Sequence, residues 1–167
     1  MKQFARLLEN STPYKSLPGA VLARRSPLLV TGLQNIHKAH YIFSLCRETG
    51  VTAHAVTSNE ASANKLCEDL NALFGEEVAI LLPSRELVFR AVEGASHEYE
   101  HARLRAFGRI LANDIKVVVS SAEGAVQYTL PPEVFLARTK ALKPGEAHDV
   151  EKLAALLVSA GYARSDQ

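Results

Sequence analysis

The sequence carries almost no net charge. Its 167 residues include 19 lysines and arginines against 18 aspartates and glutamates, so the formal net charge is only +1. A chain without an excess of one sign has no overall field that would attract nucleic acid or an anionic membrane. Binding of either through net charge is therefore excluded, and such a contact would require a local basic patch.

Cysteine is scarce, and long apolar runs are absent. The two cysteines, Cys46 and Cys67, lie among apolar residues in helical patterns, which predicts buried, reduced thiols and not a disulfide. No apolar run approaches the roughly 20 residues that span a bilayer. The first residues also lack the apolar core of a signal peptide. These absences predict a soluble, cytoplasmic protein without membrane contact.

What the sequence does contain is an alternation of short apolar runs with helical patterns. The runs, at residues 28–31, 52–56, 78–82 and 116–119, are rich in Val, Ile, Leu and Ala. Such runs are typical of strands covered on both faces, and the alternation is typical of a parallel sheet. The sequence therefore predicts an α/β fold with a three-layer αβα parallel sheet.

Two helices between these runs have clear signals. The first has Thr57 or Ser58 as N-cap with Glu60 placed for a capping box, and Gly75 ends it. The second, within residues 96–113, has an apolar stripe that leaves out three arginines. A solvated basic face is the interpretation of these arginines, and phosphate or partner contact is the alternative: Arg103, Arg105 and Arg109.

A boundary is expected at Pro131-Pro132, because two prolines cannot continue a helix. The segment after it predicts a short helix at 133–138, a strand at 139–142 and a last helix from Asp149 to Gly161. We therefore divide the chain into a helical lead-in (1–27), an α/β domain (28–129) and the start of a small α+β domain (130–167). Residues 83–96 keep neither period and predict a long surface connection.

The segment that follows the first apolar run matches part of a phosphate-binding loop. Against the pattern G-x-x-x-x-G-K-[ST], Gly32 and Lys38 have the correct spacing, but His37 replaces the second glycine and Ala39 the hydroxyl residue. A side chain at the glycine position obstructs close approach of phosphates, and a methyl group cannot bind Mg²⁺. We interpret the segment as a degenerate nucleotide loop without a cofactor.

A second motif, HEYEH at residues 97–101, is a literal H-E-x-x-H. On a helix it would place His97 and His101 to bind zinc, with Glu98 as general base. Glu100 puts a charge inside the motif, and the following HARLRAFGRI lacks the G-x-x-H continuation of related proteases. A zinc-dependent hydrolase is therefore the alternative function, and an accidental match at the start of a helix is the preferred interpretation.

The order of segments resembles the N-terminal, UvrB-like module of bacterial transcription-repair coupling factors (Mfd). The segments concerned are LLVTGL, VTSNEASANKLCEDLNALFG, VAILLPSREL, the spacing of Ser96, Arg103 and Leu104, VVVSSAEGAVQYTLPPEVF and LLVSAGYARSDQ. The start of the excision-repair subunit UvrB is also similar and has a comparable Y-A-R-x-D-Q, so an N-terminal fragment of a UvrB-type subunit is a further alternative. That protein keeps an intact phosphate loop, which favours the coupling factor.

The resemblance implies a helicase-like α/β domain that has lost ATP binding and has no catalytic residues. It implies that the small domain docks the damage sensor UvrA in nucleotide excision repair, with Arg164 at the matching contact position. DNA translocation with ATP and Mg²⁺, and contact with RNA polymerase and DNA, would reside in domains farther along the parent protein. The chain itself is expected to be a non-catalytic module.

Overall fold

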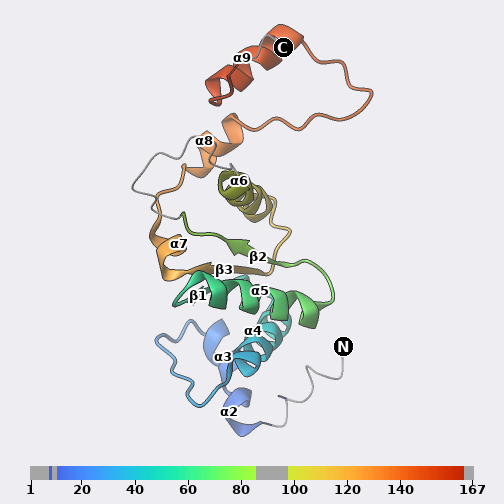
Figure 1. Cartoon of the computed structure of the whole chain (residues 1–167). Helices are drawn as coiled ribbons and strands as arrows, with labels where there is room; N and C mark the ends of the chain where they lie inside the picture. The colour runs from blue at the N-terminus through green and yellow to red at the C-terminus, as the bar shows by residue number, and fades with distance from the viewer. Residues whose placement is uncertain (1–7, 9–10, 86–97, 164–167) are drawn as a thin grey trace. The chain divides into compact units, whose positions relative to one another are not determined.

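The computed structural model of the chain describes residues 8, 11–85 and 98–163 (Figure 1). The described part is a mixture of helices and strands, and its strands form a small parallel sheet. The strands are β1 (Ala53–Thr57), β2 (Ala79–Leu82) and β3 (Val117–Ser121). The helices are α2 (Thr12–Lys15), α3 (Leu17–Leu22), α4 (Asn35–Thr49), α5 (Glu60–Phe74), α6 (Glu98–Leu111), α7 (Ala122–Val126), α8 (Pro132–Ala137) and α9 (Val150–Ser159).

The sheet has the order β1-β3-β2, with β3 parallel to both neighbours. Val117 at the start of β3 is in register with Ala53 of β1 and with Ala79 of β2. Three of the four predicted strands are thus confirmed to within two residues. The prediction of a strand at residues 28–31 is wrong: this run is not a strand, and Leu29 within it is 88% exposed.

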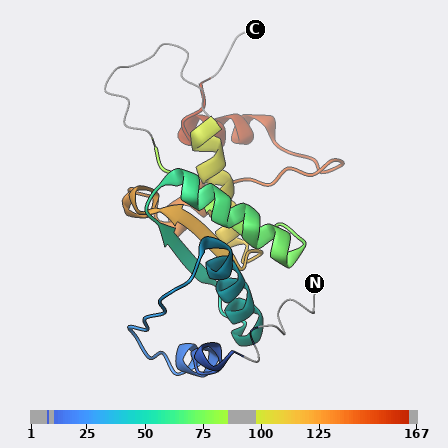
Figure 2. The same ribbon diagram turned by 60° about the horizontal axis from the view of Figure 1, so that its bottom comes forward.

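The core lies between the sheet and the pair α4 and α5, which cover one face of it (Figures 1 and 2). The apolar stripes of both helices meet the inward side chains of β3, because 3-and-4 spacing puts these residues on one helix face. The buried residues of this cluster are Ala39, Phe43, Cys46, Ala63, Cys67, Leu70, Ala79, Val117 and Val119.

Capping of α5 differs from the sequence prediction, which was wrong both in the N-cap, Thr57 or Ser58, and in the capping box with Glu60. The N-cap is Asn59, whose side chain accepts a 2.8 Å hydrogen bond from the backbone N–H of Ser62. Glu60 does not complete a capping box; its carboxylate accepts hydrogen bonds from both the N–H and the hydroxyl of Ser84. The predicted end of α5 is confirmed, since Gly75 has a φ of 76° that favours glycine.

The opposite face of the sheet is covered only in part. Helix α6 lies on that side, against β2 (Figure 1), whereas His54 and Val56 of β1 are exposed. The fold class is therefore α/β, and the described residues form a parallel sheet of three strands. A helicase-like, three-layer arrangement remains a prediction.

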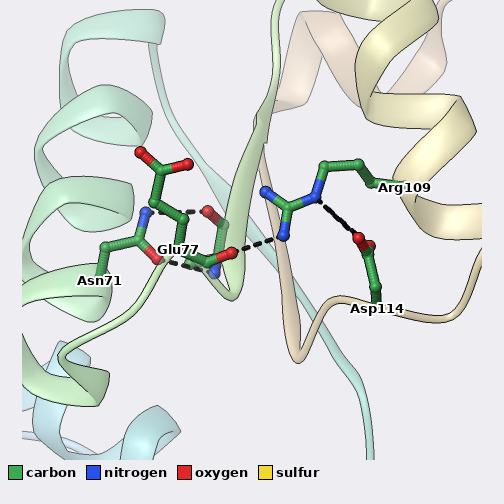
Figure 3. Close-up of polar contacts among 5 residues, drawn as sticks. Asn71, Glu77, Arg109 and Asp114 are labelled. Atoms are coloured by element: carbon green, nitrogen blue, oxygen red, sulfur yellow. Dashed lines mark hydrogen bonds and ion pairs between the residues drawn. The ribbon is translucent and has the colours of Figure 1, made fainter. Parts of the chain in front are cut away.

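The arginines of α6 do not form a uniform solvated face, which corrects the sequence interpretation. Arg103 is only 7% exposed, and its guanidinium donates a 2.7 Å hydrogen bond to the carbonyl of Pro83. Arg109 forms an ion pair with Asp114 and donates to the carbonyl of Glu77 (Figure 3). Only Arg105 is exposed as expected.

The segment before the sheet is tied to α4 by one aromatic residue. Tyr14 in α2 is almost fully buried, packs edge-on against Tyr41, and donates a 2.9 Å hydrogen bond to the Glu48 carboxylate. The short helices of the lead-in are therefore part of the packed structure around α4.

The chain divides into two compact units, Met1–Gln127 and Tyr128–Gln167. In the second, α8 and α9 confirm the two predicted helices, and Asp149 caps α9 by accepting from two backbone N–H groups. The strand predicted at residues 139–142 is not formed. The assignment of domains to 1–27, 28–129 and 130–167 remains a prediction. Among the described residues, no helix has the length and apolar character needed to cross a membrane.

Candidate functional site

The candidate phosphate loop is a turn that leads into the start of α4. Gly32 has a φ of +79°, a conformation that glycine adopts readily. Helix α4 begins at Asn35, and Lys38 in its first turns donates a 3.3 Å hydrogen bond to the side-chain oxygen of Asn35. The structure thus brings Gly32 and Lys38 to a loop and helix start, but residues 28–31 before the loop do not form a strand.

Ala39 is a further difference between this loop and a phosphate-binding loop. This residue occupies the position of the Mg²⁺-binding hydroxyl, and it is fully buried in the core beside α5 and the sheet. Position 39 therefore serves packing. A nucleotide loop would need this side chain directed at a bound metal ion.

A groove of about 950 Å³ runs beside this loop in the first unit. One wall consists of Leu28, Val30 and Leu33, and another comes from β1, at Ala55, Val56 and Thr57. Lys38 is one of its few charged residues, and most of the remaining lining is apolar. The groove thus offers an extended apolar surface and not a ring of phosphate donors.

Polar groups gather where the strands end, and this is a place where open α/β sheets bind ligands. In this chain, the polar groups form hydrogen bonds with one another and with the backbone. The Glu60 carboxylate accepts from the Ser84 hydroxyl, and the hydroxyl of Ser121 accepts a 3.1 Å hydrogen bond from the N–H of Gly124. A Cβ added at Gly124 would lie 2.9 Å from the carbonyl oxygen of Leu82. These residues fix the close approach of α7 to the end of β2.

Gln127 forms further hydrogen bonds at the same end of the sheet. The side-chain oxygen of Gln127 accepts a 2.6 Å hydrogen bond from Tyr99 and one of 3.0 Å from the N–H of Arg85. Sequence reasoning missed Gln127, because a lone glutamine after a short helix carries no signal of a tertiary partner.

The HEYEH motif falls at the start of α6, where Glu98 is the first helical residue and His101 follows one turn later. His97 lies outside the described residues. Among the residues that are described, no group of three or more His, Cys, Asp or Glu side chains is placed to hold a metal ion.

The two cysteines are buried and free, as predicted. Burial raises the pKa of the Cys46 thiol, and it raises the pKa of Cys67 to about 11. Because the thiolate is the reactive form of cysteine, thiols that stay protonated at neutral pH are poor nucleophiles. Both side chains belong to the core and not to a reactive site.

The second unit exposes apolar side chains on both of its helices. Neither α8 nor α9 has a buried residue. On α9, Val150 is 77% exposed and Val158 is 59% exposed. Surfaces of this kind are typical of sites that bind another protein. Arg164, the predicted partner-binding residue, lies outside the described residues.

One comparison with known proteins identifies a relative. The chain is 27% identical over 167 residues to the transcription-repair-coupling factor of Bacillus subtilis (strain 168). The match covers 99% of this chain but only 14% of that protein. No protein-family model matches the chain, and no solved structure matches it. The whole chain is therefore related in sequence to a region of this factor.

Proposed function

We propose that the chain is the non-catalytic, UvrB-like N-terminal module of a transcription-repair coupling factor. The observation that carries the proposal is the match to the Bacillus subtilis factor, because it extends over nearly the entire chain. A match confined to one motif would relate only one unit of the chain to the factor. The observed match includes both the α/β unit and the segment after the double proline.

The absence of catalysis is part of the proposal and rests on the chemistry of the loop. His37 replaces the glycine that lets phosphates approach, and Ala39 is buried in the core. The loop and the start of α4 would then be retained for the fold, as the remnant of a helicase-like nucleotide site. Translocation on DNA and contact with RNA polymerase would be carried out by other regions of the parent protein.

The proposed role of this region is to recruit UvrA to DNA damage at stalled polymerase. The exposed apolar residues of α8 and α9 support a docking function for the second unit, since solvent contact with such side chains is unfavourable. Arg164 would contribute a charged contact to UvrA.

Capture of purified UvrA by the immobilised 167-residue chain tests the proposal. We expect the wild-type chain to retain UvrA and Arg164→Ala to retain much less. Arg138→Ala is the matched control, because this exposed arginine also lies in the second unit, at the end of α8. Equal capture by wild type and Arg164→Ala would remove Arg164 from the site, and no capture by the wild type would contradict the recruitment role.

A further inference from the structure

A pocket of about 420 Å³ lies in the first unit beside the start of β3, and it shares no lining residue with the groove described above. Its apolar lining comes from Phe43 and Cys46 of α4 and from Leu73 and Phe74 of α5. The rings of Phe43 and Phe74 meet edge to face, with their centroids 4.7 Å apart. Because Phe43 belongs to the buried core, the pocket has an aromatic floor whose position the fold determines.

Two cations without a counter-ion lie at the rim of this pocket. Arg47 and Lys116 both line it, and both are exposed. Within residues 11–85 and 98–163, no carboxylate forms an ion pair with either of them. The guanidinium of Arg47 lies over the ring of Phe43, 5.3 Å from its centroid, in a cation–π contact. Charged donors therefore lie next to the aromatic floor.

The end of α4 accounts for one of these cations but not for both. Arg47 lies in the last turn of this helix, where the partial negative charge of the last carbonyl groups favours a cation. Lys116 directly precedes β3 and is not in a helix. Its carbonyl oxygen accepts from the Cys46 thiol at 3.9 Å, which fixes its backbone beside the floor of the pocket. The pair of cations is thus more than helix ends require.

We infer that this pocket binds a small aromatic carboxylate. The ring system of the ligand packs on Phe43, Leu73 and Phe74, and its carboxylate accepts hydrogen bonds from Arg47 and Lys116. A mostly apolar lining with a few charged groups at one side is typical of small-molecule sites, whose volumes are roughly 300–1,000 Å³. The volume of about 420 Å³ lies at the lower end of that range and suits a ligand of one or two rings.

The charges at the rim favour a ligand with a single negative charge. Glu76 is the one carboxylate in the lining, so two cations and one anion leave a local charge of +1. The last carbonyl groups of α4 and α5 add partial negative charge near Gly50 and Phe74, which also line the pocket. A phosphate ester or another dianion is therefore disfavoured, and a neutral ring compound would not use the two cations.

NMR titration of the ¹⁵N-labelled 167-residue chain with 2-naphthoate tests the inference. We expect saturable shifts of the amides of Gly50 and Lys116, with a Kd of about 1 mM or tighter. Gly32, before the other end of α4 and outside the pocket, should not shift. The neutral isostere 2-naphthamide should bind about fivefold more weakly, because it lacks the charged contact. Absence of saturable shifts at Gly50 and Lys116, or equal affinity for naphthoate and naphthamide, would overturn the inference.

Substitutions at the rim separate recognition of the carboxylate from general adsorption to an apolar surface. Lys116→Met should weaken naphthoate binding about fivefold and leave naphthamide binding unchanged. Lys15→Met is the matched control, because Lys15 is an exposed lysine of α2 that does not line the pocket. Glu76→Gln should tighten naphthoate binding, since it removes the opposing charge. Unchanged binding by Lys116→Met, weaker binding by Glu76→Gln, or tighter binding of the cation 2-naphthylmethylammonium would contradict the inference.

Discussion

Arg103 donates a hydrogen bond from its guanidinium to the carbonyl oxygen of Pro83, 2.7 Å away, in a buried position. The same nitrogen lies 3.4 Å from the carbonyl oxygen of Gly124, and the guanidinium stacks over Phe107. One side chain of α6 thus holds the end of β2 next to α7. Carbonyl groups that would otherwise be buried without donors obtain one from this arginine.

Replacement of Arg103 by alanine should therefore destabilise the fold. Loss of buried hydrogen bonds and of packing against Phe107 should lower the free energy of unfolding by about 2 kcal/mol. Urea denaturation followed by circular dichroism measures this change. Arg105→Ala, on the exposed side of the same helix, should change it by less than about 0.5 kcal/mol. Equal effects of the two substitutions would show that Arg103 is not a structural residue.

Substitution by alanine at two glycines, Gly124 in α7 and Gly108 in α6, should change the stability of the fold in opposite directions. A Cβ at Gly124 would lie 2.9 Å from the carbonyl oxygen of Leu82, so Gly124→Ala should destabilise by about 1–3 kcal/mol. A Cβ added at Gly108 in α6 would meet no neighbouring atom within 4 Å, and Gly108→Ala should stabilise by about 0.5–1 kcal/mol. Thermal unfolding of both variants checks the signs, and a Gly124→Ala protein as stable as the wild type would contradict the close contact.

Stability should fall in alkaline solution because of Cys67. Burial raises the pKa of this thiol from its usual 9.0 to about 11, so the folded state disfavours the thiolate. The contribution of the protonated Cys67 thiol to the free energy of unfolding is fully present below pH 9. It is lost as the pH rises toward about 11. The free energy of unfolding should decline over this window, and the decline should be shallower in Cys67→Ala. An identical slope in both proteins would assign the pH dependence to other groups.

ATP should not bind the loop with useful affinity. Lys38 remains, but the glycine and hydroxyl positions are occupied by His37 and the buried Ala39. Titration calorimetry with ATP and Mg²⁺ should give no heat of binding in the micromolar range. Micromolar affinity that is abolished by Lys38→Ala would show that the loop is a working nucleotide site.

The sequence predicted the elements whose signals are local. Strands β1, β2 and β3 were recognisable from their Val, Ile, Leu and Ala content, and the end of α5 from Gly75. Strands that pack against helices need such residues whatever their place in the sheet, so composition is sufficient to find them. The 28–31 run has similar composition but no pairing partner among the described residues, and a strand requires a neighbour as well as a propensity.

The sequence patterns could not predict the polar contacts between residues far apart in the chain. Arg103 lies off the apolar stripe of α6, and nothing in that pattern indicates that its donors reach Pro83 twenty positions earlier. The pairing of Asn71 with both the N–H and the carbonyl of Ala79 (Figure 3) is likewise set by the turn between α5 and β2. For the candidate phosphate loop, the spacing of Gly32 and Lys38 was visible in the sequence, while the burial of Ala39 required the structure.

The dissociation constant of the complex between UvrA and the 167-residue chain tests the central claim most directly. Titration calorimetry should give binding by the wild type, and Val158→Asp on the exposed surface of α9 should weaken it at least tenfold. Val126→Asp, at an 84% exposed position in the first unit, should bind as the wild type does. Absence of binding by the wild type, or unchanged binding by Val158→Asp, would contradict a docking role for the second unit.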